Sequence, residues 1–299
     1  MSGLDRIVVG IADGSESMAA LTWAVTEAAR AKARLTLVHA FQWMVPAYMV
    51  DSPRFAALDA VESERLSRDS ATEAAQELLE RAMEVVLHRD RDAVVDIVAA
   101  EGHPVTVLRE EAMNVDLLVV GSRGRGLLGR VLLGSVSSGI AGVPTCPVVV
   151  VRALHRQHDD NPPIVVGVDG SRASDAALRF AFESARRDSA FLRVLHGRRH
   201  NRRLGADRET TDAEEERRWL AEMVEPLASE YDDVTYTVDT VDGKAALALT
   251  DASAHARLVV VGTRGDKHLP SLRLGSVSQG VLHHAWCPVA IVPAPQTDD

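Results

Sequence analysis

Two stretches of the chain combine spaced glycines with a Gly-Ser pair, a composition suited to holding phosphate. Both follow the spacing Gly-x2-Gly-x9-Gly-Ser. Glycine lets the backbone approach a phosphate closely and permits positive φ, and successive backbone N–H groups then form a concave anion site. The candidate binding residues are Gly121, Ser122, Arg123, Gly124, Arg125, Gly126, Gly134 and Ser135 in the first stretch, and Gly262, Thr263, Arg264, Gly265, Gly275 and Ser276 in the second.

Each Gly-Ser pair is expected to open a helix. The first N–H groups of a helix have no intrahelical partner, and the helix dipole favours an anion at that end. One such contact contributes about 0.3–1 kcal/mol, or up to about 2 kcal/mol when partly buried. Several together give micromolar binding, roughly −8 kcal/mol. The alternative interpretation is a tight turn whose glycines serve only close packing.

The loops belong to an alternating pattern of strands and helices. In the first half we expect strands over 6–11, 35–39, 94–99, 117–120 and 147–151, and helices over 17–33, 57–87, 104–113 and from 135 onward. Ser15 or Ser17 is the expected cap of the first helix. In the second half a charged helix is expected over 211–230.

This alternation predicts right-handed βαβ units and a parallel sheet. Because the apolar runs are continuous, helices should cover both faces. The expected fold is α/β, with two doubly wound five-stranded parallel-sheet domains of the flavodoxin-like or adenine-nucleotide-hydrolase-like type and strand order 3-2-1-4-5. In such sheets ligands bind beyond the carboxyl ends of the strands, where the winding reverses.

The two halves are copies of one unit. Gly10 and Gly167 open the copies 157 positions apart, whereas Gly121 and Gly262 are 141 apart, so the second copy is 16 residues shorter in its middle. We expect domains over 1–154 and 163–299, joined by a polar, proline-containing linker over 155–163. If the two last strands pair at a pseudo-twofold axis, Cys146 and Cys287 approach one another.

Composition limits the function. The formal net charge is −10, which argues against nucleic acid and anionic membranes as partners. We find no secretory signal and no apolar run near the roughly 20 residues that span a bilayer, so we expect a cytoplasmic protein. Two cysteines are too few for a disulfide framework.

The chain resembles the tandem universal stress proteins of the nucleotide-binding branch. The resemblance rests on the paired Ile-Val-Val-Gly openings, the segment 168–171 (VDGS), both glycine loops and the two Cys-Pro-Val ends. It implies ATP, with or without Mg²⁺, whose adenosine lies near the end of the first strand. It further implies that Asp169 contacts the nucleoside and that Ser135, Val136, Ser276 and Val277 contact phosphate or ribose. Gly10 and Gly167 are further candidate binding residues, and so is Asp13 if its turn is remodelled.

The copies depart from this pattern in different ways. Ala12 stands where the second copy has Asp169, and Asp13 is displaced by one residue. In the second copy Asp266 brings a carboxylate into the glycine loop. We therefore expect both sites to bind, but unequally.

Rival motifs are weaker. The segment 124–129 fits G-x-G-x-x-G, but it follows the fourth strand and lacks the acidic residue about 20 positions later. No G-x4-G-K-[ST] occurs, and His39 and His196, which end equivalent strands, are interpreted as packing or hydrogen-bonding residues. Besides a nucleotide-binding regulatory protein, which we expect to form homodimers and to engage a protein partner not evident in the sequence, two alternatives stay open. They are a slow ATPase or nucleotide transferase and an interaction module without ligand.

Overall fold

The computed structural model of the protein describes residues 3–42, 60–122, 133–153, 161–198, 206–263 and 274–295. The first domain contains β1 (Arg6–Gly10), α1 (Ser15–Ala31), β2 (Arg34–Phe41), α3 (Ala60–Arg89), β3 (Val95–Glu101), α4 (Pro104–Glu111), β4 (Leu117–Gly121), α5 (Ser135–Gly142) and β5 (Val148–Val151). The second contains β6 (Ile164–Val168), α6 (Arg172–Asp188), β7 (Leu192–Arg198), α7 (Ala206–Ala228), β8 (Tyr236–Asp242), α8 (Ala245–Ala252), the 3₁₀ turn η1 (Ser253–His255), β9 (Leu258–Gly262), α9 (Ser276–His284) and β10 (Val289–Val292).

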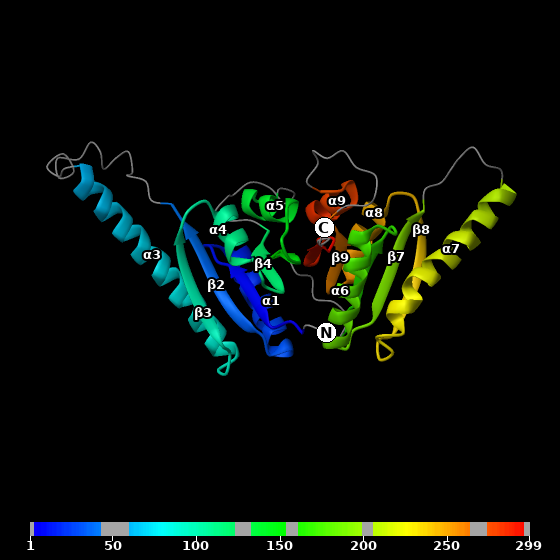
Figure 1. The fold of residues 1–299 in the computed structure, drawn as a ribbon, viewed down its shortest axis with the longest axis horizontal. Helices are drawn as coiled ribbons and strands as arrows, with labels where there is room; N and C mark the ends of the chain where they lie inside the picture. Colours follow the sequence, from blue (N-terminus) through cyan, green and yellow to red (C-terminus); the bar gives the residue numbers. More distant parts are fainter. Residues whose placement is uncertain are drawn as a thin grey trace.

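The ten strands form one sheet in the order β3-β2-β1-β4-β5-β10-β9-β6-β7-β8. Within each domain the neighbouring strands are parallel. The predicted order 3-2-1-4-5 is confirmed, and it recurs in the second domain as β8-β7-β6-β9-β10. Figure 1 shows the two domains side by side as similar halves, with α3 and α7 at the opposite ends of the molecule.

The domains join through their last strands. β5 and β10 are antiparallel, with Val150 opposite Val289 and Val149 opposite Ala290. All residues of both strands are buried. The two last strands therefore pair, as considered from the sequence, and they make one continuous sheet of two repeats. The expected approach of Cys146 and Cys287 is wrong, because the antiparallel register places them at opposite ends of the strand pair.

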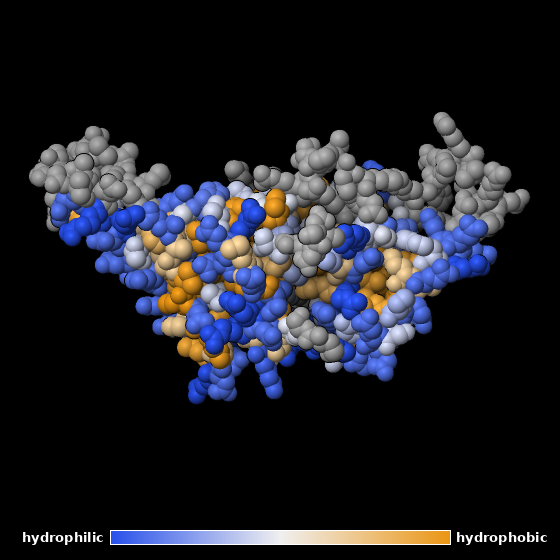
Figure 2. Space-filling view, viewed as in Figure 1, coloured by the Kyte–Doolittle hydropathy of each residue, from blue (hydrophilic) through white to orange (hydrophobic). Residues whose placement is uncertain are grey.

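Helices cover both faces of the sheet, as the continuous apolar runs predicted. On one face α1, α3, α6 and α7 pack on strand residues such as Val9 and Val166. On the other face α4, α5, α8 and α9 pack on Val8 and Val165. The face shown in Figure 2 carries many hydrophilic residues, with apolar patches on both domains. Among the described residues, no helix is long and apolar enough to cross a membrane.

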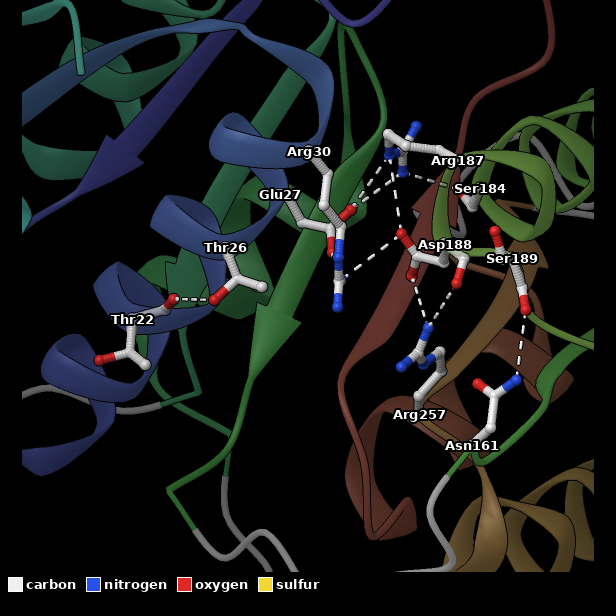
Figure 3. A network of polar contacts seen from close by, with 10 residues as sticks. All are labelled: Thr22, Thr26, Glu27, Arg30, Asn161, Ser184, Arg187, Asp188, Ser189 and Arg257. Atoms are coloured by element: carbon white, nitrogen blue, oxygen red, sulfur yellow. Dashed lines mark hydrogen bonds and ion pairs between the residues drawn. The ribbon is translucent and has the colours of Figure 1, made fainter. Parts of the chain in front are cut away.

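A network of charged side chains joins α1 to α6 where the domains meet (Figure 3). The Nε and Nη2 groups of Arg187 donate to Glu27 Oε2 at 3.3 and 3.0 Å. Arg30 Nη1 lies 2.9 Å from Glu27 Oε1 and 3.5 Å from Asp188 Oδ1. Arg257 Nη1 lies 3.2 Å from Asp188 Oδ2. The side chains of Glu27 and Asp188 are only 5% and 6% exposed, so the interface holds two desolvated carboxylates among three guanidinium groups.

The network is not symmetric between the repeats. Arg30 and Arg187 are equivalent positions, 157 apart, but Glu27 corresponds to Ser184 and Asp188 to Ala31. Burial, and then the nearby charge of Asp188, raises the pKa of Glu27, while Arg187 and Arg30 oppose that rise. The arginines thus offset part of the cost of burying the Glu27 carboxyl group.

Replacing Arg187 by leucine should destabilise the protein by about 3–5 kcal/mol, because a buried carboxylate loses its main cationic partner. Arg179, on the same helix, makes an exposed pair with Glu230 in which the two side chains are 51% and 55% exposed. Its replacement by leucine should cost about 1 kcal/mol or less. Urea unfolding of both variants measures the difference, and equal losses would refute the assignment.

Replacing Glu27 by glutamine should give a pH-dependent stability difference. The folded chain holds the Glu27 proton more tightly than the unfolded chain, since its pKa lies above the ordinary 4.5. This proton linkage favours the wild type most at low pH, and the advantage is lost as pH rises through the folded pKa. Denaturant unfolding between about pH 4 and 7 should show the wild-type stability falling relative to the variant. A relative rise would contradict the raised pKa.

Candidate functional site

The carboxyl ends of the first and fourth strands of each domain lie side by side. Gly10 pairs with Val120 in the first domain, and Gly167 with Val261 in the second. The following loops lead to helices on opposite faces of the sheet, α1 and α5 in one case, α6 and α9 in the other. This is the reversal of winding at which open α/β sheets bind ligands.

A hydrogen bond joins the two ends of each glycine loop. We call these ends the neck of the loop: residues 121–122 with 134 in the first domain, and residues 262–263 with 275 in the second. In the first domain Gly134 N–H donates to the Ser122 carbonyl at 2.7 Å. In the second, Gly275 N–H donates to the Thr263 carbonyl at 2.8 Å. The structure therefore brings both ends of each predicted loop together. The intervening candidates Arg123, Gly124, Arg125, Gly126, Arg264 and Gly265, as well as Asp266, lie outside the described residues.

The helices α5 and α9 start directly at these necks, as the Gly-Ser pairs predicted. Ser135 and Ser276 are their first residues and are exposed, whereas Val136 and Val277 are half-buried. Neither N-cap glycine is assisted by a side-chain hydrogen bond. The hydroxyls of Ser137 and Ser278 instead donate back to the Ser122 and Gly262 carbonyls, at 2.9 and 2.6 Å. Both loops thus deliver an outward-facing helix N-terminus.

The glycines of the necks serve close approach rather than positive φ. Gly134 and Gly275 have φ of −67° and −70°. A Cβ on Gly121 would stand 2.7 Å from the Glu16 carbonyl carbon, and one on Gly262 would stand 2.7 Å from that of Ala173. Gly121 and Gly262 therefore let the first turn of α1 and α6 lie against the end of the fourth strand, which is the packing alternative for these two residues.

Gly10 and Gly167 also pack closely. A Cβ on Gly10 would stand 3.1 Å from Leu108 Cδ1, and one on Gly167 would stand 2.7 Å from Leu249 Cδ1. These atoms belong to α4 and α8, beneath the site. At both glycines the space that a side chain would need is thus occupied by a leucine of α4 or α8.

The turn after β6 is organised by Asp169. Its Oδ1 accepts the N–H of Ser171 at 3.1 Å and the hydroxyl of Ser171 at 2.6 Å. Ser171 in turn caps α6 by accepting the N–H of Ser174 at 3.2 Å. Asp169 is exposed, and its second oxygen, Oδ2, lies outside these bonds of the turn. A carboxylate is thereby held at the end of the first strand of the second domain.

The corresponding turn after β1 is built differently. The expectation that Ser15 or Ser17 caps α1 is wrong, since Gly14 is the N-cap, with φ 116°, and no side chain caps the helix. Ser17 is buried, and its Oγ accepts the N–H of Ala12 at 2.9 Å. The displaced Asp13 is half-buried beside this turn. In this turn the hydroxyl of Ser17, from within α1, makes the hydrogen bond to the turn, and the carboxylate lies one residue later than in the second domain.

Glu16 is a feature of the first site that the sequence interpretation missed. Its Oε2 accepts the hydroxyl of Ser122 at 2.7 Å and the N–H of Ala153 at 2.8 Å. The carboxylate lies in the first turn of α1, where the helix dipole favours it. The repeat offset of 157 pairs Glu16 with Ala173, so a comparison of the copies was the available signal. The first site thus has a carboxylate at a position where the second has the alanine Ala173.

His39 and His196 have the hydrogen-bonding role expected of them. Nδ1 of His39 lies 2.8 Å from the Ile11 carbonyl, and Nδ1 of His196 lies 2.8 Å from the Val168 carbonyl. Since a carbonyl only accepts, Nδ1 carries the hydrogen. Each imidazole ties the end of the second strand to the end of the first.

Cys146 and Cys287 are free, buried thiols. Burial is the main cause that raises the pKa of each to about 12. Both remain protonated near neutrality, which makes them packing residues rather than nucleophiles.

The sequence profile of the Universal stress protein family matches residues 3–152 and 161–293. The chain belongs to the universal stress protein family. A universal stress protein of Mycolicibacterium smegmatis is 32% identical over 292 residues, which cover 96% of each chain. This protein thus shares its tandem arrangement with a full-length relative.

A solved universal stress protein has the same fold. One from Archaeoglobus fulgidus DSM 4304 superposes with a TM-score of 0.68 at 18% identity, covering 98% of this chain and 99% of that one. A smaller universal stress protein from Archaeoglobus fulgidus, solved in complex with dAMP, covers 44% of this chain and 97% of its own, with a TM-score of 0.34 at 24% identity.

Replacing Gly262 by alanine should destabilise this universal stress protein by about 1–3 kcal/mol, because the added Cβ overlaps the backbone of α6. The matched control is Gly3→Ala, where the nearest atom, an Asp5 carboxylate oxygen, would be 3.5 Å away. Thermal unfolding compares them. If the Gly262 variant were as stable as the wild type, close packing against α6 would not explain the glycine at this position.

Proposed function

We propose that this universal stress protein binds adenine nucleotide, with ATP as the first candidate, and that it acts through the bound state rather than by fast chemistry. The observation that carries the proposal is the arrangement at both crevices. At each crevice a closed neck joins the glycine loop to a helix whose N-cap is a glycine and whose first residue, Ser135 or Ser276, is exposed, beside the end of the first strand. The resemblance to the nucleotide-binding branch of the family favours an adenine nucleotide over other phosphate esters.

The chemistry of the arrangement suits a phosphate chain. Backbone N–H groups at a helix N-terminus donate to phosphate oxygens, and the dipole adds a favourable field. The side chains of Asp169 and, less directly, Asp13 would face the nucleoside end, where a carboxylate accepts hydrogen bonds from sugar hydroxyls. ATP would thus span from the first strand to the glycine loop, with Mg²⁺ as an optional companion of its phosphates.

The two sites are proposed to differ in affinity. The second keeps Asp169 at the end of its first strand and has Ala173 against the neck of its loop. The first has Ala12 at the former position, and the carboxylate of Glu16 bonded to Ser122 at the neck. A negative charge at this place opposes a phosphate. We therefore assign the tighter site to the second domain.

A second candidate function applies to the first domain alone. The same two features, Ala12 and Glu16, support a domain that serves interaction rather than ligand binding. Slow hydrolysis, a homodimer of whole chains, an unidentified protein partner and a cytoplasmic location stay predictions from the sequence.

The direct test is to identify and count the nucleotide released when freshly purified protein is denatured. We expect adenine nucleotide near one equivalent per chain, rising towards two when the protein is first incubated with millimolar ATP. ADP in place of ATP would support slow turnover. A protein that is empty and takes up no added ATP would exclude the proposal.

Replacing Asp169 by asparagine should weaken ATP binding at the tighter site roughly 10- to 100-fold, since a hydrogen bond to a charged acceptor contributes about 1.5–3 kcal/mol. Asparagine keeps an oxygen for the turn, so the fold should be retained. Asp13→Asn is the matched change in the first domain and should affect the tighter site little. Titration calorimetry with ATP distinguishes the two variants. If Asp169→Asn bound ATP as tightly as the wild type, the Asp169 carboxylate would not be a ligand contact.

Replacing Glu16 by glutamine should strengthen the weaker site on the order of tenfold, because a like charge near the phosphates is removed. The amide oxygen still accepts the hydrogen bonds of Ser122 and Ala153. The matched control is Glu230→Gln, an exposed carboxylate on the flank of the second domain. Calorimetry should show a tighter second equivalent in the Glu16 variant only. An unchanged ATP affinity in the Glu16 variant would show that this carboxylate does not act on the ligand.

A further inference from the structure

Trp219 is a large aromatic residue of α7 that lies beside the second site. Its Cζ2 atom stands 2.6 Å from the position of a Cβ on Gly170, the residue next to Asp169. Its ring centroid is 5.2 Å from that of His196, in an edge-to-face arrangement at 67°. The indole therefore contacts the ends of both β6 and β7, at the edge of the sheet where the ligand is proposed to bind.

The indole is only partly covered by these contacts. Trp219 remains 39% exposed, although tryptophan is a costly residue to leave in water. The turn adapts to it, because Gly170 has φ 79° and no side chain that would collide with the ring. Part of this residue thus remains accessible beside the turn that carries Asp169.

The first domain lacks this feature. The offset of 141 that relates the later parts of the repeats places Leu78 of α3 opposite Trp219. The next pair, Leu79 and Leu220, is fully buried in both domains, which supports this correspondence. Leu78 is half-buried and packs against the core. Leucine thus suffices to cover the core at this position, so packing alone does not account for tryptophan.

We propose that Trp219 forms the aromatic wall at the nucleoside end of the second site and makes that site select ligands with a planar base. This inference rests on the proposed nucleotide-binding function and extends it. The face of the indole is apolar and electron-rich, and a purine base stacks on such a surface with little dependence on its hydrogen-bonding groups. The first site, with Leu78, holds the base by weaker contacts.

The test compares two ligands that share phosphates but differ in the base. Wild type, Trp219→Leu, Trp219→Phe and the reciprocal Leu78→Trp are titrated by calorimetry with ATP and with inorganic tripolyphosphate. Base stacking on an aromatic side chain contributes about 1–3 kcal/mol, so Trp219→Leu should weaken ATP binding at the tighter site roughly 5- to 150-fold. Tripolyphosphate binding should be unchanged, and Trp219→Phe should restore most of the ATP affinity.

The outcomes separate this inference from the function on which it rests. Trp219→Leu that binds ATP as the wild type does, or that loses both ligands equally while melting at the wild-type temperature, overturns the aromatic wall and leaves nucleotide binding standing. A wild type that binds neither ligand overturns the proposed function, and the wall with it. Tighter ATP binding to the weaker site in Leu78→Trp, without a change for tripolyphosphate, supports the wall independently.

Discussion

The antiparallel pairing of β5 with β10 is the constraint on which the rest of the molecule depends. It joins two parallel five-stranded sheets into one, so that both last strands are interior strands rather than exposed edges. An unpaired edge of buried valines would favour association with other chains. The same pairing brings α1 and α6 together across the seam, because both helices cover the same face of the sheet. The relative position of the two sites is thereby fixed.

Bringing α1 and α6 together creates the polar network of Glu27, Arg30, Arg187, Asp188 and Arg257. Desolvating two carboxylates is unfavourable, and only the surrounding arginines offset it. Arg30 and Arg187 occupy equivalent positions in the two repeats, whereas the acids Glu27 and Asp188 correspond to Ser184 and Ala31. The first domain supplies Glu27 and the second supplies Asp188. The charges at the junction therefore come from non-equivalent residues of the two domains.

The sequence predicted the fold well because the fold depends on patterns repeated along the chain. Continuous apolar strands, helices between them and duplicated motifs indicate a doubly wound sheet. The strand order was expected from that fold class rather than from any residue pattern, and it is the observed one. Local features were predicted less well. The cap of α1 was misplaced, since Gly14 with its positive φ, and not a serine, begins the helix. Glu16 and Trp219 were missed because their roles depend on contacts with Ser122 and His196, far away in the sequence.

These missed residues share a physical cause. After duplication, a fused pair keeps its fold as long as both copies keep their buried strands and close-packed glycines, such as Gly121 and Gly262. The rims of the sites are free of that requirement, and there the copies differ: Ala12 against Asp169, Glu16 against Ala173 and Leu78 against Trp219. All three differences concern charge or aromatic surface at the crevices. Each of these three differences favours a ligand in the second domain over the first, whereas Asp266 in the second glycine loop acts in the opposite sense. The rims have thus diverged while the two cores have stayed alike.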